Sequence, residues 1–162
     1  MSAAKKSDSY LLWSEHNLRR CEMYKKMLLA YDGSEGAKKG LEAGINLAKV
    51  HQAELWALGV QEKLPRFAGT MDEVKEEKAF GYQHYEQLLE EARTRAQEAG
   101  IELKTDIRIG HPAKTIVEVA KEGRFDLILV GHTGLSEVWA RFLGTTAEKV
   151  SRHAPCSVLI VR

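Results

Sequence analysis

The order of apolar and polar residues predicts strands and helices in regular alternation after residue 23. Short apolar runs typical of strands occupy 25–31, 53–60, 125–130 and 156–161, and the alternating apolar and polar residues of 101–109 predict an edge strand. Between these runs, apolar residues recur at helical spacing over 35–50, 71–99, 111–123 and 145–153. The run FDLILV at 125–130 is almost wholly apolar, which is typical of a strand buried on both faces of a parallel sheet.

This alternation predicts an α/β domain built on an open, doubly wound parallel sheet of the Rossmann-like type, with helices on both faces. In such sheets a ligand binds beyond the carboxyl ends of the strands, where the strand order reverses. The turns after the first and fourth strands, DGS at 32–34 and GHTG at 131–134, both fall at that edge. We therefore expect a ligand site there.

Composition narrows the class of protein. The chain has 162 residues, of which 44% are hydrophobic and 29% charged, with a formal net charge of +1. This length suits one compact domain, and the small net charge argues against broad binding to nucleic acid or to an anionic membrane. Cys21 and Cys156 are too few for a disulfide scaffold, and no apolar run approaches the roughly 20 residues of a membrane span. These features favour a cytoplasmic protein.

The segment at 130–150, VGHTGLSEVWARFLGTTAEKV, has a pattern suited to phosphate groups. Gly131 and Gly134 allow backbone angles barred to other residues and a close approach of main-chain N–H groups to a ligand. Gly144 repeats this approach, and Thr145 and Thr146 begin a helix whose first N–H groups have no intrahelical acceptor. A di- or triphosphate fits this arrangement. The alternative is a tight turn followed by a capping box of Thr145 with the glutamate three residues later.

The sequence offers little for catalysis. It contains no recognisable local motif for a nucleophile with its base, no zinc-site spacing and no lysine-bearing phosphate loop. His132 and Arg141 lie in the glycine-rich segment and could act on a phosphate, whereas His111 before Pro112 is interpreted as a helix cap. We expect no enzymatic activity, or at most weak hydrolysis of the phosphate ligand.

Several motifs together resemble the universal stress protein family of the ATP-binding type. That family carries a Gly, two residues, Gly, nine residues, Gly and then Ser or Thr, which Gly131, Gly134, Gly144 and Thr145 match. The resemblance extends through the stretches at 25–55, 110–131 and 144–162 and covers residues 24–162 as one domain. Residues 1–23 lie outside it and are expected to form an extension that is partly disordered or a short helix.

The resemblance implies a ligand, a strand order and an assembly. ATP, with Mg²⁺ held by its phosphates, would bind across the carboxyl edge of a five-stranded sheet ordered 3-2-1-4-5, and a homodimer would form through the last strand. Asp32 would face the ribose hydroxyls, and Val60 would meet the adenine through its main chain. The remaining positions fall into two groups, a border of the base pocket formed by Ala30, Tyr31 and Val130, and a phosphate-holding group formed by Gly131, Gly134, Gly144, Thr145 and Thr146.

The helix after the first strand could take either Asp32 or Ser34 as its N-cap. Asp32 therefore also has a purely structural interpretation, as this N-cap with Glu35 as its capping-box partner. Three hypotheses for function follow from the sequence. The first is a stress-response or regulatory module that binds ATP, ADP or AMP. The second is a slow ATPase, and the third is a dimeric interaction protein that does not use nucleotide.

Overall fold

A computed structural model describes residues 23–62, 71–133 and 143–162. In these ranges five parallel strands form one sheet in the order β3-β2-β1-β4-β5, which confirms the expected fold class and strand order. The strands are β1 (Lys26–Ala30), β2 (Glu54–Gln61), β3 (Leu103–Ile109), β4 (Leu127–Gly131) and β5 (Ser157–Val161). The chain moves outward from β1 to β3 and then returns to β4 on the other side of β1, so the strand order reverses between β1 and β4.

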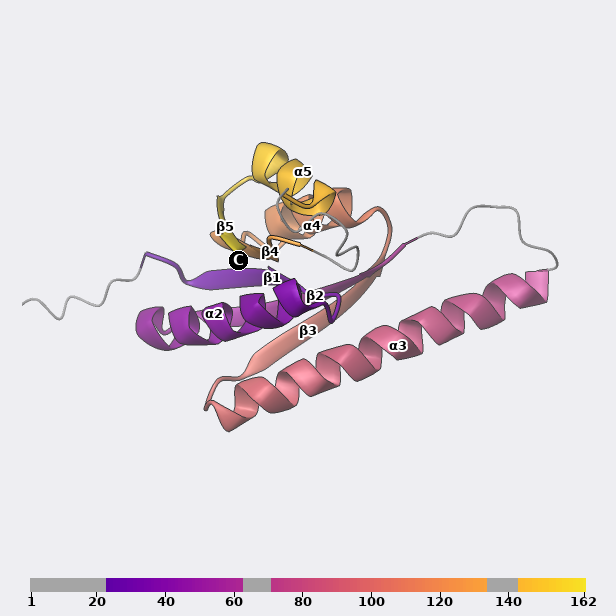
Figure 1. The fold of residues 1–162 in the computed structure, drawn as a ribbon, viewed down its shortest axis with the longest axis horizontal. Helices are drawn as coiled ribbons and strands as arrows, with labels where there is room; N and C mark the ends of the chain where they lie inside the picture. The colour runs from indigo at the N-terminus through magenta and orange to yellow at the C-terminus, as the bar shows by residue number, and fades with distance from the viewer. Residues whose placement is uncertain (1–22, 63–70, 134–142) are drawn as a thin grey trace, which may run out of the picture.

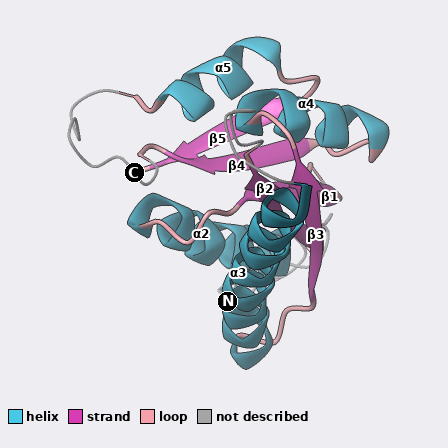
Figure 2. Cartoon of the chain, turned by 90° about the vertical axis from the view of Figure 1, so that its right-hand side faces the viewer, coloured by secondary structure: helices cyan, strands magenta, loops and turns pink. Residues whose placement is uncertain are grey.

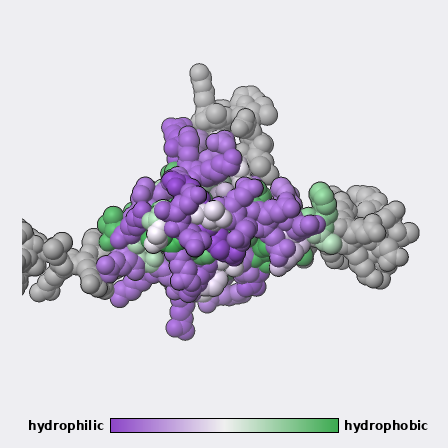
Figure 3. Space-filling view, turned by 90° about the horizontal axis from the view of Figure 1, so that it is seen from below, coloured by the Kyte–Doolittle hydropathy of each residue, from purple (hydrophilic) through white to green (hydrophobic). Residues whose placement is uncertain are grey.

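Helices cover both faces of the sheet (Figure 1, Figure 2). One face carries α2 (Glu35–His51), which packs on β1 and β4, and α3 (Met71–Glu98), which packs on β2 and β3. The other face carries α4 (Pro112–Glu122) and α5 (Thr145–His153), which contact each other. Seen from the side of α2 and α3, the described surface is mostly hydrophilic (Figure 3). Apolar side chains are therefore concentrated between the helices and the sheet, as one stripe per helix predicts.

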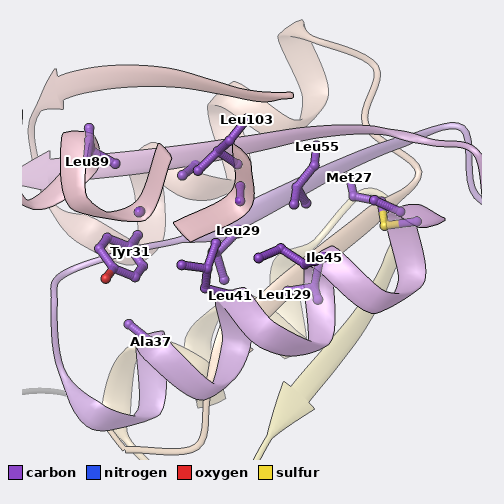
Figure 4. Close-up of a cluster of buried hydrophobic side chains, with 14 of the residues drawn as sticks. Met27, Leu29, Tyr31, Ala37, Leu41, Ile45, Leu55, Leu89, Leu103 and Leu129 are labelled. Carbon is purple, nitrogen blue, oxygen red and sulfur yellow. The ribbon is translucent and has the colours of Figure 1, made fainter. Parts of the chain in front are cut away.

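The sheet separates the core into two clusters because neighbouring side chains on a strand point to opposite faces. Leu29 lies with Ile45 and Leu55 under α2 and α3 (Figure 4). Leu28 lies in the second cluster with Val150 under α4 and α5. Full burial of a leucine side chain stabilises a fold by roughly 1.5–3 kcal/mol, so the central strands hold the sheet together.

The outer strands differ from the central ones in burial. Within the described part of the chain, β3 and β5 each pair with one neighbour, and both contain exposed positions, whereas the three residues at the centre of β1 are all buried. The alternating pattern of 101–109 had predicted an edge strand, and this is confirmed. Gly100, with a φ of 78°, follows the end of α3 as expected for a residue that stops a helix.

Candidate functional site

A cleft of about 480 Å³ opens at the carboxyl edge of the sheet, where β1 and β4 end side by side. Leu29 of β1 pairs with Leu129 of β4, so the residues that follow the two strands diverge from neighbouring points. The chain turns from β1 into α2 on one face and from β4 toward α5 on the other. The reversal of strand order therefore creates the opening.

The turn after β1 fixes the position of Asp32. Gly33 has a φ of 77°, a conformation that favours glycine, and Ser34 caps α2 by accepting a hydrogen bond from the N–H of Ala37 at 3.2 Å. The N–H of Ser34 donates to Oδ1 of Asp32 at 3.0 Å, which orients the carboxylate at the wall of the cleft. The interpretation of Asp32 as N-cap with Glu35 as partner is wrong, because Ser34 is the cap and Glu35 is the first helical residue.

Glycine is required at position 131 because the first turn of α2 lies very close to the end of β4. A Cβ atom on Gly131 would lie 2.6 Å from the carbonyl carbon of Gly36 and 3.0 Å from the N atom of Ala37, both main-chain atoms of α2. Neither Gly131 nor Gly144 has a positive φ, so the backbone angles expected from the sequence are not found at these two positions. The first turn of α2 instead packs directly on the end of β4.

The residues at the start of α5 line the cleft. Gly144 is the N-cap and makes no side-chain cap, so the proposed capping box of Thr145 is wrong. The N–H of Gly144 donates to the carbonyl of His132 at 2.9 Å, which ties the helix start to the end of β4. The N–H groups of Thr145, Thr146 and Ala147 belong to the first turn, whose donors have no intrahelical acceptor and carry the positive end of the helix dipole.

The structure brings together all the predicted site residues that it describes. Those lining the cleft are Ala30, Tyr31, Asp32, Val60, Val130, Gly131, Gly144, Thr145 and Thr146. Gly134 lies outside the described residues, as does Arg141. His132 precedes a residue of the cleft wall, Thr133, but does not line the cleft itself.

Other lining residues were not predicted, because elements distant in the sequence supply them. Pro112 and Ile116 come from the first turns of α4, and Tyr85 comes from the middle of α3. Glu62 directly follows β2, two residues beyond Val60, and this position past a strand end is the one signal that could have indicated it. No sequence pattern distinguishes Tyr85 from the other aromatic residues of a long amphipathic helix.

Burial and charge both affect the phenol groups of the cleft. Burial raises the pKa of Tyr85, and the negative charges of Asp32 and then Glu62 raise it further. Burial is also the main reason that the pKa of Tyr31 is raised. Both phenols are therefore neutral at physiological pH.

His111 is the N-cap residue of α4, as expected, but its side chain makes no capping hydrogen bond. Within residues 23–62, 71–133 and 143–162 there is no cluster of His, Cys, Asp or Glu side chains that could hold a metal ion. No helix in those ranges is long and apolar enough to cross a membrane.

The fold and the cleft define a doubly wound α/β domain with a candidate ligand site at its topological switch point. The model of the universal stress protein family matches residues 23–162, and the chain belongs to this family. Universal stress protein YxiE of Bacillus subtilis (strain 168) is 37% identical over 152 residues, which cover 86% of this chain and 100% of that protein.

Solved structures agree with this assignment. Universal stress protein UspA from Lactobacillus plantarum is similar with a TM-score of 0.78 and 30% sequence identity, covering 86% of this chain and 98% of that one. The crystal structure of a universal stress protein in complex with cAMP is similar with a TM-score of 0.65 and 26% identity, covering 86% and 97% of the two chains. The family is thus supported by sequence and by fold.

Proposed function

We propose that the cleft binds an adenine nucleotide, with ATP as the preferred candidate. We also propose that the protein acts as a nucleotide-binding module in a cytoplasmic stress response. The observation that carries this proposal is the pair of chemically different walls. Asp32 supplies an acceptor for hydroxyl groups at one wall, and the uncapped N-terminus of α5 supplies donors for an anion at the other. A nucleoside phosphate presents these two groups in one molecule.

The orientation follows from the walls. Ribose hydroxyls face Asp32, and the phosphates face Gly131, Gly144 and the first turn of α5, where the hydroxyls of Thr145 and Thr146 add further donors. Gly134 belongs to the same phosphate group by sequence pattern. Mg²⁺ bound with the nucleotide would be held mainly by phosphate oxygens and by water.

The base occupies the apolar part of the cleft. Ala30, Val60 and Val130 lie at the ends of three neighbouring strands, and Ile116 closes the same region from α4. The volume of about 480 Å³ lies within the range of small-molecule sites. The relative solved with cAMP supports the adenine base of the proposed ligand and does not bear on its sugar or phosphate groups.

Isothermal titration of the full chain with ATP, ADP and AMP tests the proposal. Wild type should bind at least one of them, and Asp32→Asn should weaken binding by about tenfold, because one hydrogen bond to a charged acceptor contributes roughly 1.5–3 kcal/mol. Glu102→Gln is the matched control, since Glu102 is an exposed carboxylate next to the start of β3, at the opposite edge of the sheet. Absence of binding by wild type, or equal affinities of Asp32→Asn and wild type, contradicts the proposal.

We also propose a homodimer that forms through β5. Among the residues that the structure describes, this strand pairs only with β4, so its outer main-chain groups face away from the sheet, and its central residue Leu159 is 37% exposed. Pairing with β5 of a second copy would satisfy those groups and cover the leucine. Light scattering should report a dimer, and Leu159→Lys should shift it toward monomer. A wild-type monomer at high concentration excludes this assembly.

A further inference from the structure

The wall of the cleft that contains Asp32 is acidic, whereas the wall at the N-terminus of α5 carries the positive end of a helix dipole. The acidic wall also contains a carboxylate that the proposed binding mode does not use. Glu62 lines the cleft directly after β2, and Asp32 lines it after β1. These two strands are parallel neighbours, with Ala30 paired to Leu58. By this register Glu62 stands beside the end of β1 and about two residues further out than Asp32, so the two carboxylates share one wall.

Tyr85 of α3 lines the same cleft and packs on β2, the strand that precedes Glu62. Its ring packs on Gly59 so closely that a Cβ atom there would lie 2.7 Å from Cδ1 of the ring. Burial raises the pKa of the Tyr85 phenol, and the charges of Asp32 and then Glu62 raise this pKa further. The tyrosine is neutral and therefore does not compensate either negative charge.

No lysine, arginine or histidine is among the described residues that line the cleft. The nearby ammonium of Lys38 donates to the Glu35 carboxylate at 2.9 Å, and neither residue lines the cleft. Among the described residues, the acidic wall is therefore not neutralised by a side chain of the cleft itself. A second negative group brought to this wall by a ligand meets two carboxylates at once.

We propose that Glu62, together with Asp32, restricts the cleft to nucleotides whose 2′ and 3′ hydroxyls are both free, and excludes nucleotides that carry phosphate at either position. This inference rests on the proposed function, since it assumes the ribose at Asp32. The excluded class contains 3′,5′-cyclic nucleotides as well as nucleotides with an added 3′-phosphate.

Two physical effects produce this selectivity. In a 3′,5′-cyclic nucleotide the 3′ oxygen is esterified, so it has no proton to donate to Asp32. The phosphodiester charge is also drawn toward the ribose, away from the N–H groups of α5 and closer to the two carboxylates. The first effect depends on the hydroxyl alone, whereas the second depends on charge and therefore on Glu62 and on ionic strength.

Titration of the full-length protein with AMP, 3′-deoxy-AMP and 3′,5′-cyclic AMP separates the two effects. For wild type we expect 3′-deoxy-AMP to bind more weakly than AMP. We expect the affinity for cyclic AMP to be lower than that for AMP by about tenfold or more. Glu62→Gln should raise the affinity for cyclic AMP by about threefold and leave AMP and 3′-deoxy-AMP within about twofold of wild type. Glu102→Gln should change none of the three affinities.

Ionic strength gives a second readout that does not depend on a variant. In about 0.5 M salt the gap between AMP and cyclic AMP should narrow for wild type but not for Glu62→Gln, because salt screens the repulsion. If wild type binds AMP and cyclic AMP with equal affinity, this inference is overturned while the proposed function stands. The same holds if Glu62→Gln changes the affinities for AMP, 3′-deoxy-AMP and cyclic AMP by the same factor. If none of ATP, ADP and AMP binds, the proposed function fails and the inference fails with it.

Discussion

The crossing of α2 over the end of β4 gives a sharp test of how this cleft is built. Gly36 lies in the first turn of α2, and a Cβ atom on it would sit far inside van der Waals contact with the carbonyl oxygen of Thr133. The Cα atom of Gly131 would be 3.5 Å away. Because the main obstacle is a backbone atom, a side-chain rotation does not relieve the overlap. Gly36→Ala must therefore displace α2 or the chain after β4.

The magnitude follows from two opposing terms. Overpacking costs roughly 1–3 kcal/mol, and a site closed by main chain belongs at the upper end of this range. Alanine in place of glycine in a helix contributes up to about 1 kcal/mol in the other direction. The expected net loss in the free energy of unfolding is about 2 kcal/mol. For a chain of this length, this corresponds to a fall in Tm of about 4–8 °C.

Gly44→Ala is the matched control, since it makes the same substitution in the same helix. Its Cβ atom would meet the methyl group Cδ1 of Leu55 at 3.3 Å, and a leucine methyl can shift by a few tenths of an ångström. We expect the free energy of unfolding of Gly44→Ala to lie within about 0.5 kcal/mol of wild type or above it. Chemical denaturation and thermal melting should be compared for both variants. Equal stability of Gly36→Ala and Gly44→Ala refutes the reasoning.

Three further predictions concern stability. Ser34→Ala removes the side-chain acceptor for the N–H of Ala37 and should lower the free energy of unfolding by about 1 kcal/mol, measured by urea denaturation. Leu129→Ala empties a fully buried position in β4 and should cost about 2–5 kcal/mol, so a loss below 1 kcal/mol would contradict the assigned packing. A hydrogen bond from Lys104 is the main cause that lowers the pKa of Glu54 below its ordinary value of 4.5. This carboxylate therefore stabilises the fold above its unfolded pKa and loses that contribution as the pH falls through the folded pKa, so the Tm difference between wild type and Glu54→Gln should shrink below about pH 4.5.

The sequence was informative where a local pattern corresponds to a local structure. Uninterrupted apolar runs marked the central strands because both of their faces are buried, and the alternating run at 101–109 marked an edge strand. Strand and helix order then fixed the side of the sheet on which the turns after β1 and β4 meet. For this reason the residues expected around Asp32 and Gly144 lie along one cleft.

Prediction from local sequence failed where the same residue pattern fits two different structural roles. Asp32 and Ser34 both suit an N-cap, and only the geometry assigns the cap to Ser34 and leaves Asp32 at the cleft wall. Gly131 suggested unusual backbone angles, whereas the structure shows that its missing side chain makes room for α2. Composition alone does not separate a glycine needed for its angles from one needed for its small volume.

By itself the sequence determined the α/β class, the order of elements and the edge of the sheet at which a ligand would bind, because these depend on periodicity along the chain. The tertiary structure decided which distant side chains complete that edge. Tyr85 and Ile116 reach the cleft only because α3 and α4 pack on opposite faces of the sheet. Packing between elements far apart in the sequence depends on the shapes of both surfaces, and no single stretch of residues records it.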